Sequence, residues 1–311
     1  MNNYNETIYC DDESTVLGDI KYTNLYTKKF DINRPTDPYI RYTETRYIPK
    51  FAYYKNDTII GKSLEWYGEY TELEIQLLRN FIKPNFIVYD IGANIGYHTV
   101  GFAKSTKHVY AFEPNKKNLK LLQNNTKQLD NVTVFDVACS DGNTDMYVED
   151  FDLDIPGNYG EMHMRDSGQL CNSKRIDDID DIYAPDLIKI DVEGHELQVL
   201  RGSLETITEY KPIIFYEAHG TDLDTIFTLL DDLGYKLYWF PCSNYYKNNH
   251  KRCETNVFGN GGVLNILALH GYPKINNLLP VKQNESYQVC VENYLKSLEE
   301  NNNVQQQEAK N

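Results

Sequence analysis

Short apolar runs alternate with amphipathic segments along the middle of the chain. The runs predict strands at residues 86–90, 109–112, 132–138, 187–192 and 212–218, and the segments between them predict helices at 97–104, 118–128, from 196 onward and at 223–233. A further helical pattern begins near Glu72 and ends at Pro84. Strands that are apolar on both faces and separated by helices form a parallel sheet covered on both sides, so the pattern predicts an α/β domain.

Two more strands follow with no helix between them. Gly234 ends the last helix, the first strand is expected at 235–240, and a long polar loop leads to the second at 262–269. Consecutive strands that lack a crossover helix can pair antiparallel. We therefore expect the sheet to end in an antiparallel hairpin.

The flanking regions lack this alternation. Residues 1–70 are rich in Tyr, Asn, Asp and Thr, which predicts an irregular extension with a few short strands before a domain at 71–272. Residues 273–311 form a polar tail, expected to be partly disordered beyond a short helix at 291–298. Within the domain, the acidic and glycine-containing segment 142–176 predicts a long irregular functional loop.

Charge and composition restrict the partners of the protein. The 311 residues include 31 Lys and Arg against 46 Asp and Glu, a net charge of −15, which argues against a protein that binds nucleic acid by neutralising phosphates. No apolar window approaches the roughly 18 residues of a membrane helix. We expect a protein that engages neither nucleic acid nor membrane; its oligomeric state is not predicted.

The cysteines and the N-terminus bear on the compartment. The six cysteines include no C-x-x-C pair, which predicts free thiols in a reducing compartment. Cys242 and Cys253 flank a polar loop, and a disulfide between them is the alternative. The first residues have neither a basic start nor an apolar stretch typical of a secretory signal, so a cytoplasmic location is expected.

Candidate chemistry begins where the first strand ends, because ligands of open α/β sheets bind at the carboxyl ends of strands. Asp90 opens a turn that contains Gly92, Asn94 and Gly96, and Glu113 closes the second strand. A carboxylate at this position can accept hydrogen bonds from both ribose hydroxyls of a nucleoside; capping the following helix is its alternative role. Asp90 would repel a pyrophosphate but suits an ammonium, which favours S-adenosylmethionine over a dinucleotide.

The ends of the fourth and fifth strands carry the remaining candidates. Alternation puts Lys189, Asp191 and Glu193 on one face of the fourth strand, where they must neutralise one another or line a wet pocket. His219 lies beyond the fifth strand, on the face of Glu217, and is the preferred general base because imidazole titrates near neutral pH; Asp191 is the alternative. The acids would also suit magnesium, but Lys189 and a helix N-terminus already partner them, so no metal is expected.

Four motifs together resemble one known family. They read DIGANIGY from Asp90, YAFEPN from Tyr110, ACSD from Ala138, and IKIDVEGHE from Ile188 followed by Leu200-Arg201-Gly202. This series is similar to that of the FkbM family of class I S-adenosylmethionine-dependent methyltransferases. The resemblance implies a Rossmann-like fold with a seven-stranded, mostly parallel sheet in the order 3-2-1-4-5-7-6, and usually O-methylation of sugars, polyketides or other hydroxylated metabolites.

The resemblance also assigns cofactor contacts. It implies that the loop residues Gly92, Asn94 and Gly96 line the methionine moiety, with Asp90 near its amine. Glu113 is then the ribose ligand. Asp141, just past the third strand, resembles the acid that accepts from the adenine amino group, while a simple turn at Asp141-Gly142 is the alternative.

The leading interpretation is an O-methyltransferase that acts on a hydroxyl of a small molecule or glycan. Segment 142–176 and the loop 239–253 are expected to shape the acceptor pocket. A nucleic-acid methyltransferase, for example one acting on an RNA cap, is a second hypothesis, which the missing basic face disfavours. A cofactor-binding interaction module without catalysis is a third.

Overall fold

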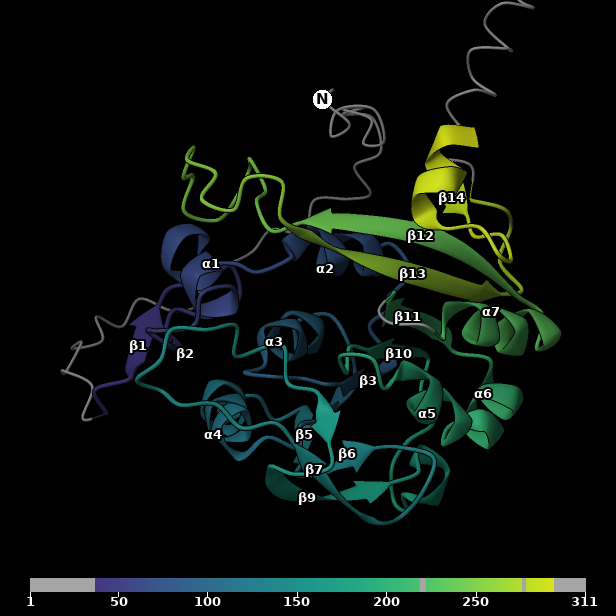
Figure 1. The fold of residues 1–311 in the computed structure, drawn as a ribbon, viewed down its shortest axis with the longest axis horizontal. Coiled ribbons are helices and arrows are strands. Elements are labelled where there is room, and N and C mark those ends of the chain that lie inside the picture. Colours follow the sequence, from purple (N-terminus) through teal and green to yellow (C-terminus); the bar gives the residue numbers. More distant parts are fainter. Residues whose placement is uncertain (1–36, 219–221, 276–277, 294–311) are drawn as a thin grey trace, which may run out of the picture.

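The computed structural model describes residues 37–218, 222–275 and 278–293. Its centre is a sheet of eight strands in the order β14-β12-β13-β11-β10-β3-β4-β5. Figure 1 shows this sheet with helices on both sides. The strands are β3 (Ile87–Ile91), β4 (His108–Phe112), β5 (Val132–Phe135), β10 (Leu187–Ile190), β11 (Ile213–Glu217), β12 (Tyr235–Ser243), β13 (Gly262–His270) and β14 (Leu279–Pro280).

The predicted α/β class is confirmed, and the strand pairing explains the apolar runs. β5, β4, β3, β10 and β11 pair in parallel, whereas β13 pairs antiparallel with both β11 and β12. All five residues of β3 are buried, with Val88 in one core cluster and Tyr89 in the other, because alternate side chains of a central strand point to opposite faces. The predicted count of seven was wrong: β14, inside the predicted tail, pairs with β12 and forms the edge of the sheet.

The helices divide between the two cores. Helices α1 (Ile60–Tyr67), α2 (Glu72–Arg79), α3 (Tyr97–Ala103) and α4 (Lys116–Thr126) place side chains in one cluster; α5 (Glu196–Arg201), α6 (Leu204–Tyr210) and α7 (Leu223–Asp232) place theirs in the other. A short 3₁₀ helix spans Ile176–Asp178. The single helix predicted from residue 196 is two helices, separated at Gly202 and Ser203. Gly202 packs so tightly that a Cβ there would lie 1.9 Å from the Ser140 carbonyl oxygen.

The prediction of an irregular loop at 142–176 was wrong for part of this segment, since its long irregular stretch is limited to residues 149–163, between two of its strands. Strands β7 (Asp145–Val148), β8 (Met164–Arg165) and β9 (Gln169–Lys174) join β6 (Ala138–Cys139) in a second sheet, in the order β6-β9-β7-β8. The predicted strand 132–138 accordingly splits between the two sheets. In β9 only Cys171 and Ser173 are buried. Because both residues are small and Ser173 is polar, the sequence shows no clear alternation of apolar and polar positions.

The described part of the N-terminal region packs into the main core. Strands β1 (Ile40–Thr43) and β2 (Phe51–Tyr54) pair antiparallel, and all four residues of β2 are buried. Asn125 of α4 holds β2 in place: its side-chain oxygen accepts from Ala52 N at 2.7 Å, and its amide donates to the carbonyl oxygens of Ala52 at 2.9 Å and Ile95 at 2.8 Å. One side chain therefore joins the N-terminal hairpin to the loop after β3.

The C-terminal segment contains a short helix near the end of the described residues. Residues 287–293 are helical, and most of the helix predicted at 291–298 lies outside the described residues. Cys242 and Cys253 are both free, so the alternative of a disulfide between them was wrong. Among the described residues, no helix has the length and apolar character needed to cross a membrane.

Candidate functional site

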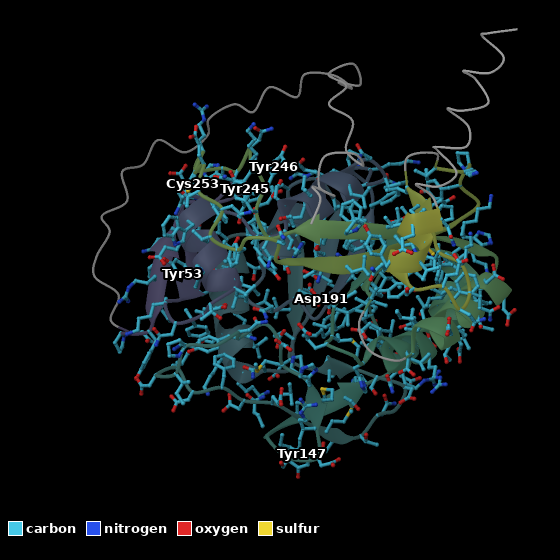
Figure 2. The ribbon with its side chains drawn as sticks, turned by 45° about the horizontal axis from the view of Figure 1, so that its top comes forward. Tyr53, Tyr147, Asp191, Tyr245, Tyr246 and Cys253 are labelled. Atoms are coloured by element: carbon cyan, nitrogen blue, oxygen red, sulfur yellow. The ribbon has the colours of Figure 1, made fainter. Side chains whose placement is uncertain are left out.

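A cavity of about 410 Å³ opens at the carboxyl ends of the central strands. The loop after β3, the ends of β4, β10 and β11, the first turns of α2 and α3, and parts of the second sheet and of the β12–β13 loop line it. In Figure 2, Asp191 lies between the β12–β13 loop, which carries Tyr245, and the second sheet, which carries Tyr147. The cavity is thus where the open α/β fold is expected to bind its ligands.

The loop after β3 forms one wall through its backbone. Gly92 has φ +77°, and a Cβ there would lie 1.7 Å from the Asp191 carbonyl oxygen. Gly96 has φ +90°, and its Cβ would lie 2.6 Å from Leu122 Cδ1. Only glycine fits either position, because a side chain would meet both steric exclusion and left-handed backbone strain. The structure brings the predicted residues Gly92, Asn94 and Gly96 together on the cavity wall.

Glu113 stands at the cavity with both carboxylate oxygens oriented by backbone amides. Oε2 accepts from Asn94 N and Oε1 accepts from Asn115 N, each at 2.8 Å. Burial raises the pKa of Glu113 to about 7, against the lowering effect of these two hydrogen bonds. Each oxygen keeps a second lone pair, so the carboxylate can still accept hydrogen bonds from a ligand.

Two of the predicted cofactor contacts lie away from the cavity lining. Asp90 is fully buried beneath the loop: Thr99 Oγ1 donates to its Oδ2 at 2.6 Å, and Lys189 Nζ lies 3.6 Å from its Oδ1. Asp141 is exposed to solvent, and Ser140 Oγ lies between it and His195 Nε2, at 3.4 and 2.9 Å respectively. The roles assigned to Asp90 and Asp141 toward a cofactor remain predictions.

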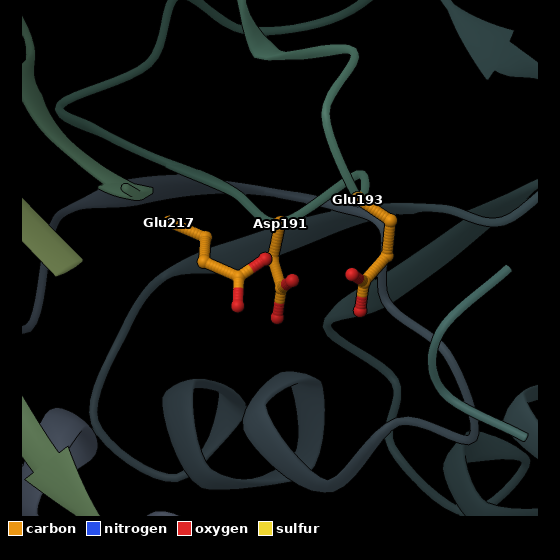
Figure 3. A group of neighbouring side chains, drawn as sticks. All are labelled: Asp191, Glu193 and Glu217. Carbon is orange, nitrogen blue, oxygen red and sulfur yellow. The ribbon is translucent and has the colours of Figure 1, made fainter. Parts of the chain in front are cut away.

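Carboxylates from the ends of β10 and β11 converge on the cavity. Asp191, Glu193 and Glu217 each offer an oxygen within 4.8 Å of the others, and Figure 3 shows the three side chains pointing to the same side. The strand ends at Ile190, earlier than predicted, and Glu193 has φ +54°, so a turn and not strand alternation brings Glu193 here. The predicted partner His219 lies outside the described residues.

The electrostatics of this group are unbalanced. Lys189 is 2% exposed, and its Nζ donates to Asp191 Oδ2 at 3.1 Å. Burial raises the pKa of Glu193 to about 8 and that of Glu217 to about 10, and the charge of Asp191 adds to both shifts. Oxygen ligands of this kind suit a divalent cation, and a cationic ligand would equally relieve the crowding of negative charge.

A second polar group on the cavity wall was missed by the sequence analysis. Glu74 and His98 line the cavity, with Glu74 Oε2 3.1 Å from His98 Nε2 and Asn265 Nδ2 donating to Glu74 Oε1 at 3.1 Å. The one available signal was that Glu74 shares a helix face with the buried Leu78, four residues later, which is unusual for a carboxylate.

The segments expected to shape an acceptor pocket do reach the cavity. Met162 and Met164 of the 142–176 segment line it, together with Asn244 of the β12–β13 loop. Tyr159 lies beside the cavity and stacks on Phe151, with ring centroids 4.2 Å apart. The methionines give this side of the cavity an adaptable apolar surface.

Together, the glycine turn after the first central strand, the carboxylate after the second and the antiparallel strands that close the sheet define a Rossmann-like α/β protein of the methyltransferase type. Residues 90–237 match the model of the methyltransferase FkbM domain, Methyltransf_21. The resemblance that the motifs predicted is confirmed over this segment.

Two curated relatives are similar to part of the chain. A hexuronic acid methyltransferase, AglP, from Haloferax volcanii is 25% identical over 164 residues, covering 51% of this chain and 66% of the relative. A 2-O-methyltransferase, NoeI, from Sinorhizobium fredii is 27% identical over 155 residues, covering 43% of this chain and 64% of the relative. The matched region thus spans slightly less than two thirds of each relative.

Solved structures also resemble the chain. The crystal structure of methyltransferase FkbM from Methylobacillus flagellatus has 22% sequence identity and a TM-score of 0.42, covering 60% of this chain and 44% of that one.

Proposed function

We propose that the protein is an S-adenosylmethionine-dependent methyltransferase that methylates a hydroxyl group of a small molecule or glycan. The observation that carries the proposal is that two kinds of residues line one cavity. The first are those of the glycine loop and Glu113, and the second are polar side chains from α2, α3 and the ends of β10 and β11. A methyl transfer needs two such adjoining subsites so that donor and acceptor align.

The residues present fit the cofactor. Gly92 and Gly96 allow the tight left-handed turns that hold the loop backbone on the cavity wall, and Glu113 offers acceptor lone pairs to ribose hydroxyls. Asp191 would hold the ammonium group, which also offsets the excess of negative charge among the neighbouring acids. When bound, the cofactor supplies a methyl group activated by a positively charged sulfur. The chain itself would contribute alignment, exclusion of water and removal of the acceptor proton.

The hydroxyl acceptor is supported by the names of the two curated relatives, a hexuronic acid methyltransferase and a 2-O-methyltransferase. Lys189 would fix the position of Asp191, and Glu193 and Asp191 would accept hydrogen bonds from acceptor hydroxyls. His219 remains a candidate proton acceptor from the sequence. The net charge of −15 continues to disfavour a nucleic-acid acceptor.

The proposal is tested in two stages with the full chain. Calorimetry should detect S-adenosylmethionine binding that Glu113→Ala abolishes, and mass spectrometry should detect a gain of one methyl group on a member of a panel of sugars, glycans and hydroxylated metabolites. Binding without turnover of any acceptor would favour an interaction module. Turnover of RNA, with binding that falls steeply as salt rises, would favour the nucleic-acid alternative. No cofactor binding would refute the proposal.

A further inference from the structure

The Glu74–His98 pair lies in the cavity and has no part in the roles assigned above. His98, at the start of α3, is 7% exposed, and Glu74, in the first turn of α2, is 3% exposed. His98 Nε2 lies 3.1 Å from Glu74 Oε2 and 3.1 Å from Thr71 Oγ1. A buried carboxylate held to one nitrogen of an imidazole is the arrangement that orients a histidine for proton transfer.

The tautomer is assigned from the contact with Glu74. An ionised carboxylate only accepts hydrogen bonds, so we assign the hydrogen of the neutral ring to Nε2, directed toward Glu74, with the Thr71 hydroxyl beside it. The lone pair of the neutral imidazole then lies on Nδ1. Asn265 of β13 fixes the other oxygen of Glu74 through its donated hydrogen bond at 3.1 Å. Glu74 is therefore held from two sides and in turn holds His98.

The surroundings place this pair beside the acceptor half of the cavity. Asn265 of β13 is the register partner of Glu217 of β11. Because Asn265 also donates to Glu74, the Glu74–His98 pair lies close to the carboxylates at the strand ends. Tyr70 also lines the cavity, and its ring packs edge-on to that of His98 with centroids 6.2 Å apart. Asp191, Glu74, Glu217 and Glu193 all add to the raised pKa of Tyr70, which burial raises first, so these four carboxyl groups lie on the same side of the cavity as the ring that packs against His98.

We infer that His98, oriented by Glu74, accepts the proton of the acceptor hydroxyl. In this step the O–H bond of the acceptor breaks, its proton passes to Nδ1 of His98, and the electron pair stays on the oxygen, which becomes the nucleophile. Glu74 stabilises the resulting imidazolium and is a positioning residue. The inference rests on the proposed function and adds to it the group that activates the acceptor.

Other groups in the cavity are less suited to this task. His195 Nε2 lies 2.9 Å from Ser140 Oγ, on the side of the cavity formed by the second sheet. Asp191 Oδ2 already accepts a hydrogen bond from the buried Lys189, and the cofactor ammonium is assigned to the same carboxylate. His98 has both an orienting carboxylate and a position on the cavity wall.

The test uses the full chain with His98→Gln, Glu74→Gln and His219→Gln, and His108→Gln as the matched control. His108 is a half-buried histidine whose Nε2 lies 2.9 Å from Thr133 Oγ1, away from the cavity. We expect His98→Gln to lower kcat by about 10²- to 10⁴-fold and to remove the acidic limb of the kcat against pH profile. Glu74→Gln should lower kcat less, and KM for the cofactor should change little in both. His108→Gln should match the wild type.

A second measurement does not depend on turnover. In histidine-labelled protein with S-adenosylhomocysteine, adding the acceptor should shift the imidazole nitrogen signals of His98 and not those of His108. Unshifted His98 signals would overturn the inference but not the proposed function. The same holds if His98→Gln keeps the kcat of the wild type while His219→Gln loses it. A wild-type protein that methylates no acceptor would overturn the proposed function, and the inference with it. Unchanged S-adenosylmethionine binding by His98→Gln shows that this variant is folded, and if it does not fold, Glu74→Gln and the signal shift decide.

Discussion

Replacing Glu113 with glutamine should make the stability of the protein less dependent on pH. The pKa of Glu113 lies near 7 in the folded protein because of burial, against an ordinary value of 4.5. The folded state therefore binds this proton more tightly than the unfolded chain, and its stability falls as pH rises from about 4.5 to about 7. The total contribution is about 3 kcal/mol, since one pKa unit corresponds to about 1.4 kcal/mol.

Glutamine removes this dependence but introduces a local conflict. Asn94 N and Asn115 N both donate to the carboxylate at 2.8 Å, and the NH₂ group of glutamine would face one of these donors. A lost hydrogen bond of this kind costs about 1–3 kcal/mol. At pH 5 we therefore expect Glu113→Gln to be less stable than the wild type by that amount. Between pH 5 and pH 8 the wild type should lose about 2.5 kcal/mol relative to the variant, because only the wild type ionises a buried carboxyl at position 113, so the difference should vanish or reverse.

Urea unfolding at pH 5 and pH 8 measures the difference directly. Asp57, Glu69 and Glu196 also have a pKa raised to about 6 or 7 by burial, so only the comparison with the variant isolates Glu113. Calorimetry measures cofactor binding. The ribose hydroxyls donate to the ionised form of Glu113, so S-adenosylmethionine affinity should rise up to about pH 7, with proton release on binding. In Glu113→Gln the affinity should fall about 10- to 100-fold.

Glu69→Gln is the matched control for Glu113→Gln. Glu69 has a similar pKa but lies outside the cavity lining, paired with Arg46 at 2.7 Å. Its replacement should change the pH dependence of stability without weakening cofactor binding. An equal stability difference between the wild type and Glu113→Gln at both pH values would refute the electrostatic reasoning, and unchanged affinity would refute the ribose role.

Three further outcomes are expected. Gly92→Ala should lose about 2–4 kcal/mol of stability in urea unfolding, because its Cβ would lie 1.7 Å from a carbonyl oxygen. The control Gly142→Ala, whose Cβ would have nothing within 4 Å, should change the stability by less than about 0.5 kcal/mol. Equal losses in the two variants would contradict this reasoning. Asp191→Asn should lower the pKa of Glu217, which burial and then the Asp191 charge raise, as carboxyl carbon NMR can measure; an unchanged titration would exclude the coupling. Dialysis against a chelator should leave turnover unchanged, because Lys189 already pairs with one of the three acids; loss of turnover restored by magnesium would establish a metal.

The regular part of the fold could be predicted because burial leaves a direct mark on sequence. A central strand such as β10, with all four residues buried, must be apolar on both faces, and this distinguishes it from a helix of one apolar stripe. The second sheet and β14 left weaker marks. β14 has two residues, and the strands of the second sheet bury small or polar residues such as Ser173, so their pairing depends on tertiary contacts.

The candidate site divides in the same way. The glycine loop and Glu113 could be predicted because strand ends converge at one edge of a parallel sheet. The Glu74–His98 pair could not, since it joins one helix that precedes the first central strand in the sequence to one that follows it, and the buried position of Glu74 does not indicate its partner. For Asp90 the sequence predicted the position but not the contacts. Its side chain lies beneath the loop, where it accepts a hydrogen bond from Thr99 and lies near Lys189.

The three hydrogen bonds of Asn125 have a practical consequence for cutting the chain. The family match begins at residue 90, yet Asn125 holds the backbone of Ala52 with the same amide group that holds Ile95 of the glycine loop. A shortened protein that starts at the family boundary would lose β2 and leave this amide, and the apolar surface under Phe51, open to water. The smallest unit able to form the site therefore begins before residue 51, well ahead of the segment that matches the family model.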